Sequence, residues 1–150
     1  MTTYQNETTD YTKTLRLSAS ADTVFHALTQ VSGLSSWWTR ATGSGNAGGE
    51  LRFYFDSSVD ACVMTVDQAQ HPTQVTWTVT ECRFLPDWLG TQPTFTIEPI
   101  DHDACELHFR HHGLTAELDC IEMCTVGWDT YLASLRQYVQ TGQGAPFTNA

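Results

Sequence analysis

Apolar and polar residues alternate along much of this 150-residue chain, and a period of two is typical of strands with one buried face. In GELRFYF, Leu51, Phe53 and Phe55 share one face, and the residues between them belong to the other. The segments QVTWTV and CELHFRH repeat this alternation. The pattern predicts strands over residues 12–18, 49–55, 62–68, 74–80, 94–98 and 105–111.

Helical spacing follows the first of these strands. Ser20 is a suitable N-cap, and the apolar residues after it recur at intervals of three and four, which predicts a helix over residues 21–30. We expect Gly33 to end this helix, and residues 34–39 then predict a short helical turn that carries two adjacent tryptophans. Residues 41–49, ATGSGNAGG, have the composition of a flexible loop.

A second helical pattern spans residues 118–140, near the end of the chain. Gly127 interrupts it, at a cost of about 1 kcal/mol relative to alanine. We therefore expect a kink, or a change from a short helix to a long one, near residues 122–127. The order of strand, two helices, five strands and long helix favours an α+β fold with an antiparallel sheet over a doubly wound parallel one.

The length fits a single domain, residues 1–150, in which residues 1–10 and 141–150 are expected to be flexible. Seven basic residues, of which only Lys13 is a lysine, stand against 17 acidic ones, so the formal charge is −10. This charge argues against nucleic acid and anionic membranes as partners, because each phosphate contact needs a cation.

The opening segment MTTYQNETTDY has neither the basic nor the apolar region of a signal peptide. No apolar run approaches the roughly 20 residues that cross a bilayer. The five cysteines are irregularly spaced, which is typical of reduced thiols rather than of a disulfide framework. These features predict a cytoplasmic protein that does not insert into a membrane.

Five segments together resemble the SRPBCC superfamily, which has the START-like, birch-pollen-allergen-like helix-grip fold. Within it, the chain is most similar to the branch of heat-shock-protein-90 ATPase activator homologues. The resemblance rests on the order and spacing of the segments, and Ala21 stands where the family usually has a proline. The segments are ASADTVFHALTQVSGLSSWWT, GGELRF, QVTWTV, LHFRHHGL and GWDTYLASLRQYV, and with the residues between them they cover nearly all of residues 12–140.

The resemblance implies a curved antiparallel sheet wrapped around a long C-terminal helix, with a cavity between them. It implies no single activity, because one fold hosts many functions. We expect binding of a hydrophobic or aromatic small molecule in the cavity, without assured catalysis. Two alternatives stay open: a cavity enzyme of cyclase or hydrolase type that acts on a hydrophobic substrate, and a chaperone-associated protein–protein module. Two copies of the chain could pair as a homodimer.

Ten residues are candidates for ligand binding. Nine are aromatic, and His111 is a polar residue in phase with the apolar face of the last strand. Each could instead be a packed core residue, but small-molecule sites are mostly apolar with a few polar groups, so the set as a whole fits a cavity. The candidates are Trp37, Trp38, Phe53, Phe55, Trp77, Phe95, Phe109, His111, Trp128 and Tyr131.

We expect no metal and no cofactor. Cys120 and Cys124 would share a helical face, but a structural zinc site usually needs four ligands at tighter spacing. His108 and His111 point to opposite faces of a strand and cannot complete such a site together. No motif of nucleophilic catalysis or of phosphate binding is present. A strongly shifted pKa inside the pocket would favour the enzyme, with His111 or Glu122 as the groups to examine.

Overall fold

The computed structural model describes residues 11–54, 61–82, 88–113 and 121–146, without the side chains of residues 121–127. Within these residues, seven antiparallel strands form one sheet in the spatial order β1-β7-β6-β5-β4-β3-β2. The strands are β1 (Tyr11–Leu17), β2 (Arg40–Gly43), β3 (Glu50–Tyr54), β4 (Ala61–Gln70), β5 (Gln74–Glu81), β6 (Gln92–Asp101) and β7 (Ala104–His112). The helices are α1 (Ala21–Thr29), α2 (Val31–Trp37) and α3 (Ile121–Thr141).

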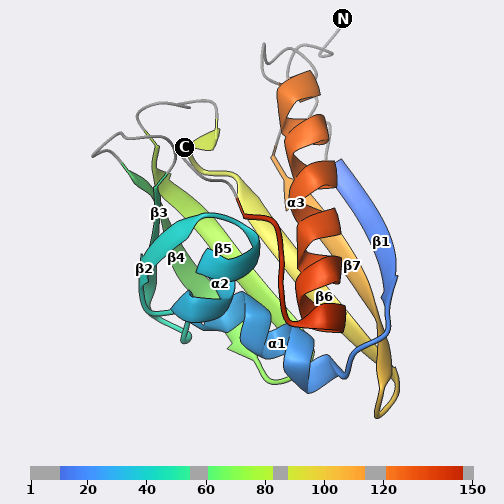
Figure 1. Cartoon of the computed structure of the whole chain (residues 1–150). Helices are drawn as coiled ribbons and strands as arrows, with labels where there is room; N and C mark the ends of the chain where they lie inside the picture. Colours follow the sequence, from blue (N-terminus) through green and yellow to red (C-terminus); the bar gives the residue numbers. More distant parts are fainter. Residues whose placement is uncertain (1–10, 55–60, 83–87, 114–120, 147–150) are drawn as a thin grey trace, which may run out of the picture.

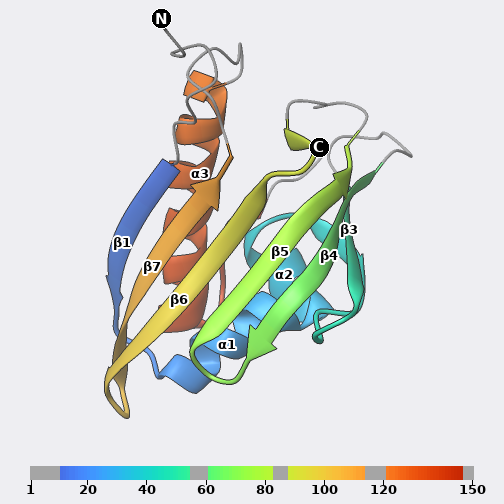
Figure 2. The ribbon, with the colours of Figure 1, turned by 180° about the vertical axis from the view of Figure 1, so that it is seen from behind.

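The three helices lie on one face of the curved sheet (Figure 1). The long helix α3 crosses the concave face beside β6, β7 and β1, while α1 and α2 cover the part nearer β2 to β5. Seen from behind, the convex face carries no helix (Figure 2). This arrangement is the α+β helix grip predicted from the sequence. Among the described residues, no helix combines the length and the apolar character needed to cross a membrane.

The strand at Arg40–Gly43 differs from the sequence-based expectation of a flexible loop over residues 41–49. It pairs with β3, with Ala41 opposite Phe53, and Ala41 is buried. The Thr39 hydroxyl also donates a hydrogen bond of 2.6 Å to the carbonyl oxygen of Tyr54. Pairing with a neighbouring strand and burial of one side chain thus override the glycine-rich composition.

The first two helices separate at Gln30, and not at Gly33 as the sequence predicts. Ser20 caps α1 as expected, since its hydroxyl accepts the backbone N–H of Thr23 at 3.1 Å. Gln30 adopts an extended conformation between the helices, and Gly33 lies inside α2. A Cβ atom at Gly33 would stand only 3.0 Å from the Cα of Ala27. The glycine therefore permits the close approach of α1 and α2, and it does not act as a helix terminator.

Ile121–Thr141 forms one uninterrupted helix, so the predicted change from a short helix to a long one near residues 122–127 does not occur. The predicted start at residue 118 lies outside the described residues. After α3 the chain turns at Gly142, which has φ of 86°. It then returns to the helix, where the backbone N–H of Ala145 donates to the Ser134 hydroxyl at 2.7 Å.

Candidate functional site

Eight large rings cover the concave face between the sheet and α3, and we call them the aromatic cluster. Strand alternation turns four of them inward from β3, β5, β6 and β7, as the sequence predicts. Two come from the end of α2, one from α3, and one from the segment before β6. The rings are Trp37, Trp38, Phe53, Trp77, Trp88, Phe95, Phe109 and Trp128, all of them buried.

Trp38 lies at the centre of the aromatic cluster. Its ring centroid is 4.4 Å from that of Phe53 and 5.1 Å from that of Trp128, and it stacks on Trp77 at 6.0 Å. The adjacent Trp37 has a different role, because its indole N–H donates to the carbonyl oxygen of Ala27 at 2.8 Å. Of the two adjacent tryptophans, Trp37 anchors α2 to α1 and Trp38 joins the rings over the sheet.

The rings of the aromatic cluster on β5, β6, β7 and α3 also contact one another. Phe95 lies 5.1 Å from Trp77 and 4.8 Å from Phe109, and Phe109 lies 4.4 Å from Trp128. These centroid separations are those of aromatic rings in direct contact. The rings therefore pack on one another as a layer.

His111 lies buried at the edge of this layer and links three elements by hydrogen bonds. The indole N–H of Trp128 donates to His111 Nδ1 at 2.9 Å, and His111 Nε2 lies 2.8 Å from the Thr91 hydroxyl. Because indole can only donate, Nδ1 must be the acceptor, and the proton of the neutral imidazole resides on Nε2. The Thr91 hydroxyl then donates to the carbonyl oxygen of Trp88 at 2.6 Å. The chain of donors runs in one direction, from Trp128 through His111 and Thr91 to the backbone of Trp88.

Trp77 differs from Trp37 and Trp128 in its hydrogen bonding. Its side chain is fully buried, and its indole N–H has no acceptor among the described residues. Buried N–H groups are nearly always paired, because an unpaired one costs about 1–3 kcal/mol. Trp77 Nε1 is therefore the polar atom at which the cluster could accept a partner from outside the chain.

Of the remaining candidates from the sequence, one lies at the edge of the aromatic cluster and the others lie outside the described residues. Tyr131 is half-buried, with its ring centroid 6.0 Å from that of Trp38, and burial raises the pKa of its hydroxyl. Phe55 lies outside the described residues, as do the side chains of Glu122, Cys120 and Cys124.

Trp88 and Thr91 belong to the site but were not among the sequence candidates. They lie in an irregular segment between strands, where neither a period of two nor helical spacing indicates the direction of a side chain. The tryptophan itself was the available signal, because large aromatic side chains are seldom left fully exposed.

Grooves on the surface of the described residues include the following two, and Phe109 is the member of the aromatic cluster that lines one of them. One, of about 300 Å³, lies between α1 and the end of α3 and is lined by His26, Tyr138 and their neighbours. The other, of about 540 Å³, lies on the convex face of the sheet across β1, β6 and β7.

A curved sheet that grips one long helix over an aromatic face defines a domain of the helix-grip class. The chain belongs to the family of Activator of Hsp90 ATPase homolog 1-like proteins, whose model matches residues 18–140. This is the branch of the SRPBCC superfamily that the sequence resembles. No curated protein matches the chain significantly.

Solved structures share the fold at low sequence identity. The Aha1 dimer from Colwellia psychrerythraea has a TM-score of 0.79 and 24% identity, with 91% of this chain and 99% of that chain covered. A conserved protein of unknown function from Enterococcus faecalis has a TM-score of 0.72 and 19% identity, covering 91% and 74%. CalU16 from Micromonospora echinospora has a TM-score of 0.72 and 16% identity, covering 91% and 76%. At these identities the similarity establishes the fold and not an activity.

Proposed function

We propose that this domain binds an apolar or aromatic small molecule that carries a hydrogen-bond acceptor, against the aromatic cluster between the sheet and α3. The observation that carries the proposal is the buried, unpaired indole N–H of Trp77. A ligand oxygen beside this N–H would recover the roughly 1–3 kcal/mol that an unpaired donor costs. Trp37 and Trp128, in contrast, already have acceptors within the chain.

The described rings touch one another, so we propose that a ligand enters by displacing a ring. Trp88 is the ring best suited to move, since it is 8% exposed while the other members of the cluster are at most 2% exposed. It stacks on Trp128 with a centroid separation of 5.9 Å. We propose that a flat ligand takes the place of Trp88 on the face of Trp128.

Burial of the ligand rings drives such an exchange. Burying one aromatic ring of a ligand over roughly 150 Å² contributes on the order of 4 kcal/mol at about 25 cal/mol per Å². Two rings contribute about 8 kcal/mol, which corresponds to a micromolar dissociation constant before the entropic cost of binding and the displacement of Trp88 are subtracted.

The described polar groups favour binding over catalysis. Both ring nitrogens of His111 are already hydrogen-bonded to Trp128 and Thr91, so proton transfer would first have to break a buried contact. Burial raises the pKa of Tyr131, which favours the neutral hydroxyl.

Tryptophan fluorescence tests the proposal directly. The protein is titrated with palmitate, emodin, anthraquinone and anthracene, and we expect emission shifts with dissociation constants between about 1 μM and 1 mM for the ring compounds. Anthraquinone and anthracene have the same three-ring frame, but only anthraquinone has carbonyl acceptors. Trp77→Phe removes the N–H and keeps a ring, so it should weaken anthraquinone about tenfold while changing anthracene much less.

Two results would contradict the proposal. If Trp77→Phe weakens both compounds equally, the indole N–H does not recognise an acceptor. If no compound shifts the emission and a crystal structure grown with anthraquinone shows Trp88 still stacked on Trp128, the aromatic cluster is only a core.

We also propose the cytoplasm as the compartment of this protein. The register that pairs Val63 with Glu81 brings Cys62 opposite Cys82, and the two thiols are hydrogen-bonded. An oxidising compartment would join such a pair, whereas a reducing one keeps both thiols. Protein purified without reductant from cytoplasm should be fully alkylated after denaturation, and a Cys62–Cys82 disulfide found by mass spectrometry would count against this compartment.

A homodimer is a further proposal, supported by the dimeric state named for the Colwellia psychrerythraea Aha1 structure. Analytical ultracentrifugation over about a hundredfold range of protein concentration decides it, because a dimer dissociates by mass action on dilution. A monomer at every concentration would refute it.

A further inference from the structure

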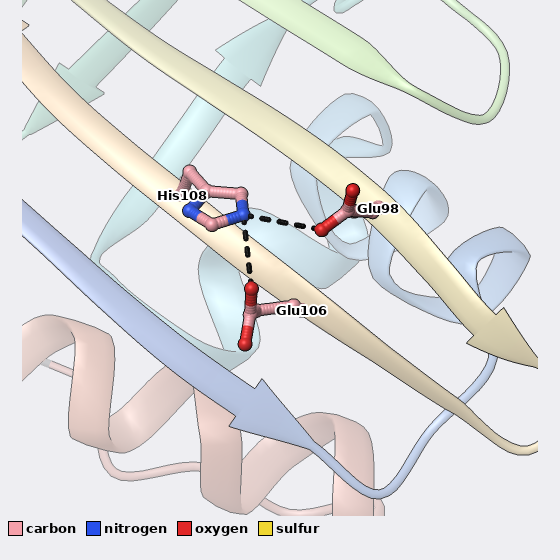
Figure 3. Close-up of side chains that lie close together, drawn as sticks. All are labelled: Glu98, Glu106 and His108. Atoms are coloured by element: carbon pink, nitrogen blue, oxygen red, sulfur yellow. Dashed lines mark ion pairs between the residues drawn. The ribbon is translucent and has the colours of Figure 1, made fainter.

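One imidazole and two carboxylates converge on the face of the sheet opposite to the aromatic cluster, and Figure 3 shows the three side chains. We call His108, Glu98 and Glu106 the His108 cluster. Glu98 of β6 pairs directly with Glu106 of β7, and His108 is two residues further along β7. Because side chains alternate in a strand, this register places all three on the same outward face.

The spacing of the three ligand atoms suits a metal ion. His108 Nε2 is 3.2 Å from Glu106 Oε1 and 3.6 Å from Glu98 Oε1. Zinc binds nitrogen and oxygen ligands at about 2.0–2.2 Å, so tetrahedral ligands stand roughly 3.3–3.6 Å apart. The two observed distances lie just below this range and at its upper limit, so an ion could enter with small side-chain movements.

A residue on a third strand orients the imidazole. Thr14 of β1 pairs with His108, and its hydroxyl lies 3.2 Å from His108 Nδ1. With a metal on Nε2, the proton resides on Nδ1 and is donated to the Thr14 hydroxyl. A hydrogen bond of this kind on the far nitrogen is the usual support of a metal-binding histidine.

The charges of the His108 cluster also favour a cation. Carboxylates directly opposite each other on neighbouring strands destabilise a sheet. Arg16 pairs with Glu106 across β1 and β7, but it forms no ion pair with Glu106 within the described part of the chain. A divalent ion would neutralise both carboxylates, where a protonated imidazole neutralises one charge.

The cluster borders the larger surface groove, which leaves coordination positions open. His108 and Thr14 line this groove of about 540 Å³, together with Thr96 and other polar side chains. Three protein ligands leave a tetrahedral zinc ion one further position, which water or a small anion would take.

We propose that His108, Glu98 and Glu106 bind a divalent cation of the zinc class on the convex face, with Thr14 as the orienting residue. The imidazole selects zinc and its neighbours in the transition series over Mg²⁺ and Ca²⁺, which prefer oxygen ligands alone. The site is independent of the aromatic cluster, since its side chains lie on the opposite face of the sheet.

Isothermal titration of the EDTA-treated full chain with zinc sulfate tests the site. We expect one ion per chain with a micromolar dissociation constant, and no comparable binding of magnesium chloride. His108→Ala and the isosteric Glu106→Gln should each weaken zinc binding at least about tenfold. His102→Ala is the matched control, because His102 is an exposed histidine in the hairpin between the same two strands.

A second readout separates the site from adventitious binding. Cobalt(II) should give a visible absorption band typical of four-coordinate nitrogen and oxygen ligands, and His108→Ala should abolish it while His102→Ala preserves it. Equal zinc binding by the wild type, His108→Ala and Glu106→Gln would overturn the proposal and assign the zinc to other groups. Failure of the wild type to bind zinc below millimolar concentration would also overturn it.

Discussion

Replacing Thr91 with valine tests whether the buried hydrogen bonds from His111 to Thr91 and from Thr91 to the Trp88 carbonyl stabilise the protein. Valine preserves the shape of the side chain and removes the hydroxyl, which accepts from His111 Nε2 at 2.8 Å and donates to the carbonyl oxygen of Trp88 at 2.6 Å. Thr91 is only 4% exposed, so water does not readily replace the lost partner.

The expected loss follows from these two contacts. Each buried hydrogen bond contributes about 0.5–1.5 kcal/mol net, and a buried N–H without an acceptor costs about 1–3 kcal/mol. Burial of the added methyl group offsets a little under 1 kcal/mol. We expect Thr91→Val to lower the free energy of unfolding by about 2–3 kcal/mol, and the melting temperature by about 4–10 °C.

Urea unfolding, monitored by circular dichroism, measures the change. Thr96→Val is the control, because Thr96 is an exposed threonine of β6 with no hydroxyl hydrogen bond to a described residue. It should stay within about 0.5 kcal/mol of the wild type. With His111→Phe as the background, Thr91→Val should cost about 1 kcal/mol less, because the imidazole partner is already gone.

The reasoning fails if Thr91→Val and Thr96→Val have the same stability. It also fails if the cost of Thr91→Val is unchanged when His111 is replaced, because the hydroxyl and the imidazole would then act independently. In that case the lost stability would come from the hydrogen bond between Thr91 and the Trp88 carbonyl alone.

Three further substitutions have defined outcomes. Gly33→Ala should destabilise the protein in thermal melts although alanine favours helices, because its Cβ would stand 3.0 Å from the Cα of Ala27; a stabilised variant would show that α1 and α2 separate freely. Trp38→Ala should cost about 3–5 kcal/mol in urea unfolding, and a cost below about 1 kcal/mol would show that this ring is not central to the core. The Tyr11 hydrogen bond holds the pKa of Asp129 below its ordinary value, so the carboxylate contributes stability above about pH 4 that is lost as the pH falls through the folded-state pKa. Asp129→Asn should therefore be less stable than the wild type at pH 7 and equally stable in strong acid, and a difference that persists in acid would contradict the assignment.

The sequence alone determined which face each strand buries. A period of two requires successive side chains to point to opposite sides, so Phe53, Trp77 and Phe95 had to lie on one face of their strands. The same rule separated His111, which is buried, from His108, which lies outside. The order of the elements was enough to predict an α+β fold with an antiparallel sheet, and the family resemblance added the grip on the terminal helix.

Local conformation in the connections depended on tertiary contacts. Arg40–Gly43 is a strand because β3 pairs with it, and Gly33 lies inside α2, where its missing Cβ permits the close approach of α1. Composition therefore predicted a loop and a helix end where packing produced a strand and a continuous helix.

The chemistry of both candidate sites also depended on the tertiary structure. Whether the rings enclose a space or touch one another depends on distances between strands and helices, which no periodicity specifies. The unpaired N–H of Trp77 and the hydrogen bonds of His111 follow from the same packing. The His108 cluster required the register of β6 against β7, because Glu98 and Glu106 become neighbours only when the two strands pair at that position.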